Sequence, residues 1–129
     1  PFGAGRTSPI SADDVARVVA TLLRDPANRI GQVYELTGPQ ALGLDGLAEQ
    51  YTRALKRPIA AEDLSLDEWE REVLAPAGLP DHVRQHIATM ARLHREGRYD
   101  RATDDVAQIT GHPAQTVEQY VASDPDLFY

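Results

Sequence analysis

The sequence predicts a mostly helical α/β fold, in which several helices surround two short strands. Apolar residues recur at helical spacing along most of the chain, and capping residues, Gly or Pro mark the helix ends. Between two such helices, residues 32–37 are β-prone and end at Gly38-Pro39, and residues 59–64 form a second run. Two strands alone make a marginal sheet. We therefore expect them to pair with strands from a missing domain or a partner chain.

Composition is that of an ordinary globular domain and excludes several functions. The 129 residues are 42% hydrophobic and 26% charged, enough for one domain with a modest core over residues 1–129. The net charge of −7 disfavours binding to nucleic acid or an anionic membrane. The absence of cysteine excludes disulfides and thiolate metal sites, and is compatible with the cytoplasm. No apolar run approaches the roughly 18 residues that span a bilayer.

The first predicted helix begins at the cap Ser11 and ends at Asp25-Pro26. Asp13 and Asp14 place negative charge in its first turn, where the helix dipole favours it. Its apolar stripe consists of Val15, Val18, Val19, Leu22 and Leu23. This spacing predicts one buried face along the whole helix.

Five further helices are predicted after Gly38-Pro39. Their expected ranges are about 43–56, 65–74, 82–96, 103–111 and from His112-Pro113 onward. Ser65 and Glu68 form a capping box at the start of the second of these, and Gly97 is expected to terminate the third. The tail Leu127-Phe128 is apolar, so we expect it to dock on another part of the protein.

Short motifs, each weak alone, follow one another in a fixed order over nearly the whole chain. They are Ile10-Ser-Ala-Asp-Asp-Val-Ala16, Leu22-Leu-Arg-Asp-Pro26, Gly31-Gln-Val-Tyr34, Tyr34-Glu-Leu-Thr-Gly-Pro39, Arg57-Pro-Ile59, Glu96-Gly97, Thr103-Asp-Asp-Val106 and Thr110-Gly-His-Pro113. Together they resemble the C-terminal portion of the NmrA-like proteins. These proteins are atypical relatives of the short-chain dehydrogenase/reductase family and bind NAD(P)H.

The resemblance implies a molecule in two parts. In the family, an N-terminal Rossmann domain binds NADP or NAD, and a smaller C-terminal part closes over the nicotinamide and shapes the substrate pocket. This chain would be the substrate-binding part, with the dinucleotide-binding domain absent. Some members of the family reduce quinones or other small carbonyl compounds. Others, such as the regulator NmrA, bind the dinucleotide without known turnover.

The residues that the family uses for cofactor and hydride chemistry are missing from this chain. There is no Gly-x-x-Gly-x-x-Gly, since Gly3 and Gly5 follow no predicted strand and no third glycine completes the pattern. The pair Tyr-x-x-x-Lys is also missing, because Tyr51 lies five residues before Lys56, the only lysine. No cofactor-binding residue is therefore assigned here, and the catalytic residues stay unknown.

Four residues are candidates for the lining of a substrate pocket. They are Trp69, Met90, His94 and Tyr99. A tryptophan with methionine and aromatic neighbours can bind a flat apolar ligand such as a quinone. The alternative is that Trp69 and Met90 are core residues on their helix stripes. His94 and Tyr99 have polar tips with no assigned structural task, and His94 is the candidate proton donor near neutral pH.

Three other groups of residues have simpler explanations than catalysis or binding. His82 and His86 share a helix face at metal-ligand spacing, but no third ligand is placed beside them, so no metal site is predicted. The acidic pairs Asp13-Asp14 and Asp104-Asp105 are explained by helix capping and the helix dipole. The arginines that recur every third residue from 92 to 101 indicate an exposed helix end.

Three functions remain open. The first is the substrate-binding part of an NAD(P)H-dependent oxidoreductase that acts on a small hydrophobic carbonyl or quinone. The second is a regulatory module that senses NAD(P) without turning it over. The third is a free-standing binder, isomerase or cyclase that needs no cofactor. Strand edges and the apolar tail also favour self-association, so a homodimer is an expected assembly.

Overall fold

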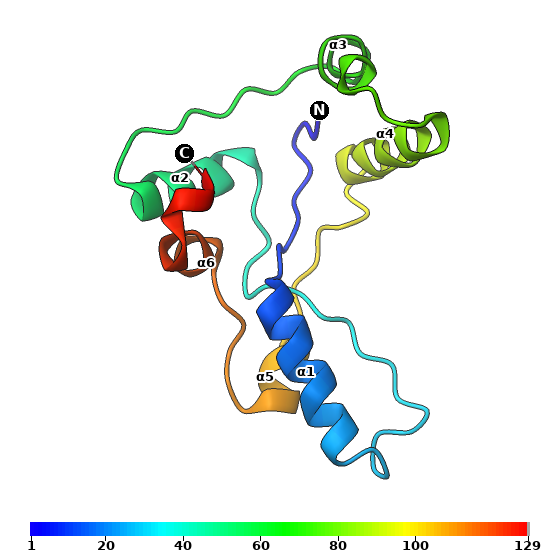
Figure 1. Ribbon diagram of the computed structural model, residues 1–129, viewed down its shortest axis with the longest axis vertical. Coiled ribbons are helices and arrows are strands. Elements are labelled where there is room, and N and C mark those ends of the chain that lie inside the picture. The colour runs from blue at the N-terminus through cyan, green and yellow to red at the C-terminus, as the bar shows by residue number, and fades with distance from the viewer. Residues whose placement is uncertain (129) are drawn as a thin grey trace.

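The computed structural model describes residues 1–128 and shows helices joined by extended segments (Figure 1). The α-helices are α1 (Ala12–Arg24), α2 (Leu44–Leu55), α3 (Leu66–Trp69), α4 (Asp81–Arg95), α5 (Asp105–Thr110) and α6 (Val117–Ser123). A π-helical turn, η1 (Glu70–Leu74), and a 3₁₀ turn, η2 (Ala75–Ala77), lie between α3 and α4, and a further 3₁₀ turn, η3 (Pro125–Phe128), follows α6. No helix among residues 1–128 is long and apolar enough to cross a membrane.

The helices form three groups. α1 packs on α5, α2 packs on α6 with η3 beside it, and α3 with η1 and η2 packs on α4 as a helical hairpin. Figure 1 shows the groups arranged around a central point where extended segments cross. The chain therefore has several small contact regions in place of one large core.

The α1–α5 pair holds the best-defined apolar core. Val18 of α1 packs with Val106 and Ile109 of α5, and with Ala114 just beyond α5. All four side chains are buried. Tyr34, from the segment that was predicted as a strand, packs against this cluster and is partly buried.

The α2–α6 pair is closed by aromatic rings. Phe128 of η3 makes edge contacts with Tyr51 of α2 and Tyr120 of α6, at centroid distances of 5.6 and 6.4 Å. The prediction that Phe128 docks on the protein is confirmed. The prediction is wrong for Leu127, which is 70% exposed because the short 3₁₀ turn directs neighbouring side chains to different sides.

Local capping explains where several helices begin. Ser11 accepts a hydrogen bond from the Asp14 backbone N–H at α1, and the capping box of Ser65 and Glu68 is formed at α3, as predicted. The start of the last helix was predicted wrongly. α6 begins after Thr116 and not at His112-Pro113, because Thr116 and Gln119 form a capping box of their own.

The two predicted strands are absent from residues 1–128, where one isolated β-bridge joins Thr7 to Leu42. Residues 32–37 are extended, but side chains hold their backbone in place of a neighbouring strand. Asp105 accepts from the Glu35 N–H at 2.7 Å, and the Thr103 hydroxyl donates to the Glu35 carbonyl. A strand exists only when another strand pairs with it, and none lies alongside this segment.

The second predicted strand, residues 59–64, is instead a connection between α2 and α3. The backbone N–H of Ile59 donates to the Thr52 hydroxyl at 3.0 Å, so the segment turns back on the end of α2. Further along it, the Asp63 carboxylate accepts from the Gly3 N–H at 2.9 Å. These contacts anchor the connection to other parts of the chain without a sheet.

Three extended segments cross at the centre of the molecule. Gly38 donates its backbone N–H to the Ser8 carbonyl at 3.1 Å, and the Ser8 hydroxyl donates to the Arg101 carbonyl at 2.6 Å. Thr37, which is buried, accepts from the Thr103 N–H at 2.8 Å. The Tyr-Glu-Leu-Thr-Gly-Pro motif thus contributes its Thr and Gly to the junction that joins the helix groups.

The predicted apolar stripe of α1 is only partly buried, and the α3–η1 segment likewise buries only some of its apolar residues. On α1, Val18 is fully buried, but Val19 is 47% and Leu23 73% exposed, because α5 covers only one side of the helix. On the α3–η1 segment, Leu74 is buried and Val73 is half exposed. The wider π-helical turn shifts the face that each residue occupies, which helical spacing in the sequence does not reveal.

Candidate functional site

Three rings from distant parts of the chain meet at the end of α4. His94 stacks on Phe2, with ring centroids 4.2 Å apart and an interplanar angle of 22°, and meets Tyr99 edge-on at 5.9 Å. Gly5 lies so close that a Cβ there would stand 2.2 Å from the His94 carbonyl oxygen. The structure therefore brings together two of the four predicted pocket residues, His94 and Tyr99, and adds Phe2 to them.

His94 is buried, and this burial lowers the pKa of its imidazole below the ordinary value. Burial disfavours the charged form, and a hydrogen bond with the Gly5 backbone only partly opposes this effect. The neutral imidazole is thus the main form near neutral pH. A lowered pKa disfavours the imidazolium form that the predicted role of proton donor requires.

The lowered pKa of His94 predicts how stability depends on pH. The unfolded chain takes up this proton at higher pH than the folded chain, so the free energy of unfolding should fall as pH decreases through the ordinary histidine pKa. We expect urea unfolding at about pH 7.5 and about pH 5.5 to show a smaller difference for His94→Phe than for the parent chain. His86→Gln, at an exposed site on the same helix, should keep the parental difference. An unchanged difference in His94→Phe would contradict the assignment.

Trp69 and Met90 do not join the ring cluster. Met90 is 44% exposed on α4, and Trp69 is half-buried at the end of α3. The alternative reading as fully buried core residues is therefore also wrong for Met90. The hairpin leaves one side of α4 uncovered, so a residue on a predicted inward stripe faces outward.

A groove of about 980 Å³ lies between α3–η1 and α4, and we call it the α3–α4 groove. Its walls include Leu66, Asp67, Glu70, Leu74, Arg84 and Ala88. None of the four predicted pocket residues lines it. By helical spacing, Gln85, Ala88 and Arg92 of the groove lie on the side of α4 opposite to Met90 and His94. The groove could not be predicted from the sequence, because polar and small residues at this spacing are also typical of an ordinary solvated helix face.

The other candidate groups have structural roles. Among residues 1–128 no three His, Cys, Asp or Glu side chains come together as metal ligands. Asp13 is exposed, as a helix-dipole residue is expected to be, whereas Asp14 is fully buried and hydrogen-bonded. Asp105 holds the backbone of Glu35, as described above. Arg92 pairs with Glu96 at 2.6 Å, in agreement with an exposed helix end.

Comparisons with known proteins point to one class. No protein-family model matches the chain. The chain is 27% identical over 128 residues to an NAD(P)H azoreductase of Xenophilus azovorans. The aligned residues are 99% of this chain and 44% of that protein. The chain is 32% identical over 109 residues to the festuclavine dehydrogenase of Aspergillus fumigatus, covering 84% of this chain and 38% of that protein.

The comparison with solved structures leads to the same class of protein as the comparison with curated relatives. An NADPH-dependent quinone oxidoreductase from Escherichia coli, in complex with NADPH, superposes with a TM-score of 0.80 and 26% identity over 98% of this chain and 43% of that one. The chain therefore has a fold found in NAD(P)H-dependent reductases. More particularly, it corresponds to the C-terminal part of these reductases, in agreement with the part of the molecule that the sequence resemblance predicts. It spans less than half the length of the relatives it matches.

Proposed function

We propose that the chain is the substrate-binding part of an NAD(P)H-dependent reductase that acts on a small hydrophobic carbonyl compound or quinone. The main support is similarity over 99% of the chain to an NAD(P)H azoreductase, together with structural similarity to an NADPH-dependent quinone oxidoreductase. Both proteins are named for reduction of an organic substrate by a nicotinamide dinucleotide. The proposed location is the cytoplasm, with which the absence of cysteines is compatible.

NADPH or NADH would be held by a domain outside this chain. The described residues do not fit a dinucleotide site, because residues 1–128 form no strand that could lead into a glycine turn at a helix start. The glycines with positive φ at 78, 97 and 111 instead follow helical turns. The dinucleotide would supply a hydride, and we assign to this chain only contacts with the substrate.

The surface that would face this domain is the uncovered apolar side of the α1 region. Val19 and Leu23 of α1 are exposed, as are Ile30 and Val33 in the segment that follows. Residues 32–37 are extended and lack a neighbouring strand, so they could gain one from the sheet of a dinucleotide-binding domain. The same surface would serve a homodimer, which is the competing assembly.

Trp69, Met90, His94 and Tyr99 remain the proposed substrate contacts. His94 and Tyr99 form one cluster, and Trp69 and Met90 offer apolar surface on the hairpin. Met90 and His94 are one helical turn apart on α4, so a single flat substrate could contact both of them. Their role is to bind and orient the substrate, and no proton-transfer step is assigned to any of the four.

The test uses the full-length protein that contains this chain. Oxidation of NADPH or NADH should accelerate when a quinone such as menadione is added, and Met90→Ala should raise KM for the quinone more than it changes kcat. His82→Ala, at an exposed position of α4, is the matched control. Binding of NADPH without turnover would favour the sensor function. Failure to bind either dinucleotide would overturn the proposal and leave a cofactor-independent binder, isomerase or cyclase.

A further inference from the structure

We propose that the α3–α4 groove is a separate binding site for a small apolar molecule that carries a positive charge, such as an arylalkyl amine. The groove lies on the side of α4 opposite to Met90 and His94. None of the four proposed substrate contacts lines it, and this inference does not depend on the proposed function. Three properties of the groove support it: its size and floor, the helical irregularity in its wall, and its unpaired charge.

The groove has the size and floor of a small-molecule site. Its volume of about 980 Å³ lies near the upper end of the range for ligand pockets, roughly 300–1,000 Å³. Leu66, Leu74, Ala75 and Ala88 give it an apolar floor. Leu74 is 4% exposed, so this floor is fixed by packing within the hairpin. Such a floor favours a ligand with a hydrocarbon or aromatic body.

One wall of the groove is built on an irregular helix. η1 is a π-helical turn, a rare conformation that occurs frequently at functional sites. The turn brings Glu70, Arg71 and Leu74 to the groove, while Val73 faces solvent. The irregularity thus lies in the segment that presents both apolar and charged groups to the groove.

Two carboxylates of the groove, Asp67 and Glu70, form no ion pair within the described part of the chain, although Asp67 interacts electrostatically with Arg71. Each of the three arginines in the walls is already paired: Arg71 with Glu72 at 2.9 Å, Arg84 with Asp81 at 2.8 Å and Arg92 with Glu96 at 2.6 Å. The carboxylates of Asp67 and Glu70 make no ion pair or hydrogen bond with residues 1–128. The remaining charge is negative, and it selects a positively charged ligand.

The experiment compares three probes of the same shape on the full-length protein that contains this chain. The probes are 4-phenylbutylamine, 4-phenylbutyrate and 4-phenylbutanol. Their binding is measured by isothermal titration and by the change in tryptophan fluorescence, to which Trp69 at the end of α3 contributes. We expect the amine to bind about fivefold more tightly than the carboxylate, since each exposed charge contact contributes up to roughly 1 kcal/mol. The preference should decrease with added salt.

Three variants make the test specific. In Asp67→Asn/Glu70→Gln the preference for the amine should disappear while binding of the alcohol is unchanged. Asp25→Asn/Asp126→Asn removes the same charge at exposed positions remote from the groove and should keep the preference. Ala88→Trp, checked for folding by circular dichroism, should abolish binding of all three probes. Equal affinity for amine and carboxylate, a preference that survives the groove double variant, or no binding of any probe would overturn the proposal.

Discussion

Gly38→Ala should destabilise the protein by about 3 kcal/mol or more, because the new Cβ would overlap another segment of backbone. An ideal Cβ at Gly38 would stand 1.9 Å from the carbonyl oxygen of Pro9 and 2.9 Å from its carbonyl carbon. Both atoms belong to the main chain at the central crossing, where the neighbouring Ser8 carbonyl already accepts the Gly38 N–H. They cannot move aside as a flexible side chain could.

The measurement is urea unfolding of the 129-residue chain, monitored by far-ultraviolet circular dichroism. Gly43→Ala is the matched control, because the nearest atom to its new Cβ is the Arg6 side chain at 4.0 Å. This control should cost no more than about 1 kcal/mol, since it changes only a helix N-cap. Equal losses for the two variants would show that the crossing at Gly38 is not tight.

The helices could be predicted because their ends are encoded locally. Ser11 at the start of α1 and Ser65 with Glu68 at α3 specify caps through side chains within four residues of the backbone they bind. The sequence also contains the cap of α6, Thr116 with Gln119, and the helix begins there and not at the predicted start His112-Pro113. Local chemistry thus specifies the start of this helix as well.

The absence of the two predicted strands from residues 1–128 could not be predicted, because a strand forms only where a second strand pairs with it. Residues 32–37 have the composition of a strand and are extended, yet a β-ladder needs hydrogen bonds from a second strand. Val33 is 94% exposed in the middle of this segment. Residue pattern alone does not reveal whether the chain that would cover Val33 belongs to the same sequence.

The candidate site was predicted in part. The polar tips of His94 and Tyr99 indicated a special location, and the two rings do meet. Phe2 was missed because it lies more than ninety residues away in the sequence and no periodicity links it to α4. The α3–α4 groove was missed for a different reason: it depends on a π-helical turn and on which arginines are already paired, and both are properties of the three-dimensional structure.

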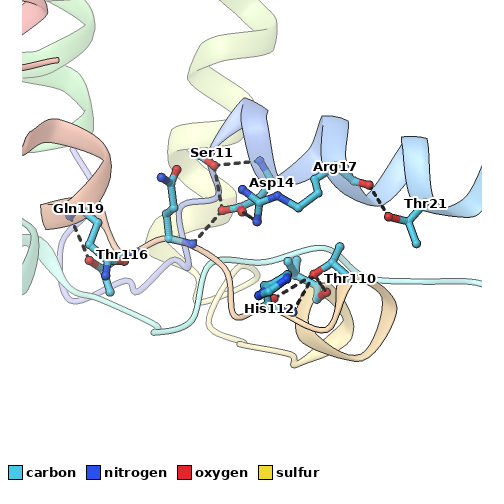
Figure 2. A network of polar contacts seen from close by, with 10 residues as sticks. Ser11, Asp14, Arg17, Thr21, Thr110, His112, Thr116 and Gln119 are labelled. Carbon is cyan, nitrogen blue, oxygen red and sulfur yellow. Dashed lines mark hydrogen bonds and ion pairs between the residues drawn. The ribbon is translucent and has the colours of Figure 1, made fainter. Parts of the chain in front are cut away.

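Asp14→Ala should cost about 3 kcal/mol, the second large effect, because it removes a buried charged acceptor. The Asp14 side chain has no exposed surface and lies between α1 and the segment before α6 (Figure 2). Its carboxylate accepts from the Ser11 hydroxyl at 2.8 Å, from Arg17 at 2.9 Å and from the backbone N–H of Gln115 at 2.8 Å. The last bond joins positions 101 residues apart.

Asp13→Ala is the matched control, because Asp13 has the same charge one residue earlier but is exposed. It should cost only about 0.5 kcal/mol, through the helix dipole. Hydrogen exchange distinguishes two roles of Asp14: a clamp, in which its carboxylate holds the Gln115 amide, and a local cap of α1. In Asp14→Ala the Gln115 amide should lose protection from exchange. Ser11→Ala should weaken α1 and leave that amide protected. Similar stability in the two aspartate variants, or an unchanged Gln115 amide, would contradict the clamp. The distinction matters because Asp14 belongs to the Asp-Asp-Val-Ala motif, and the sequence pattern assigns both carboxylates of this motif to helix capping and the helix dipole. If the clamp holds, one of the two carboxylates fixes the tertiary structure by joining α1 to the segment that precedes α6.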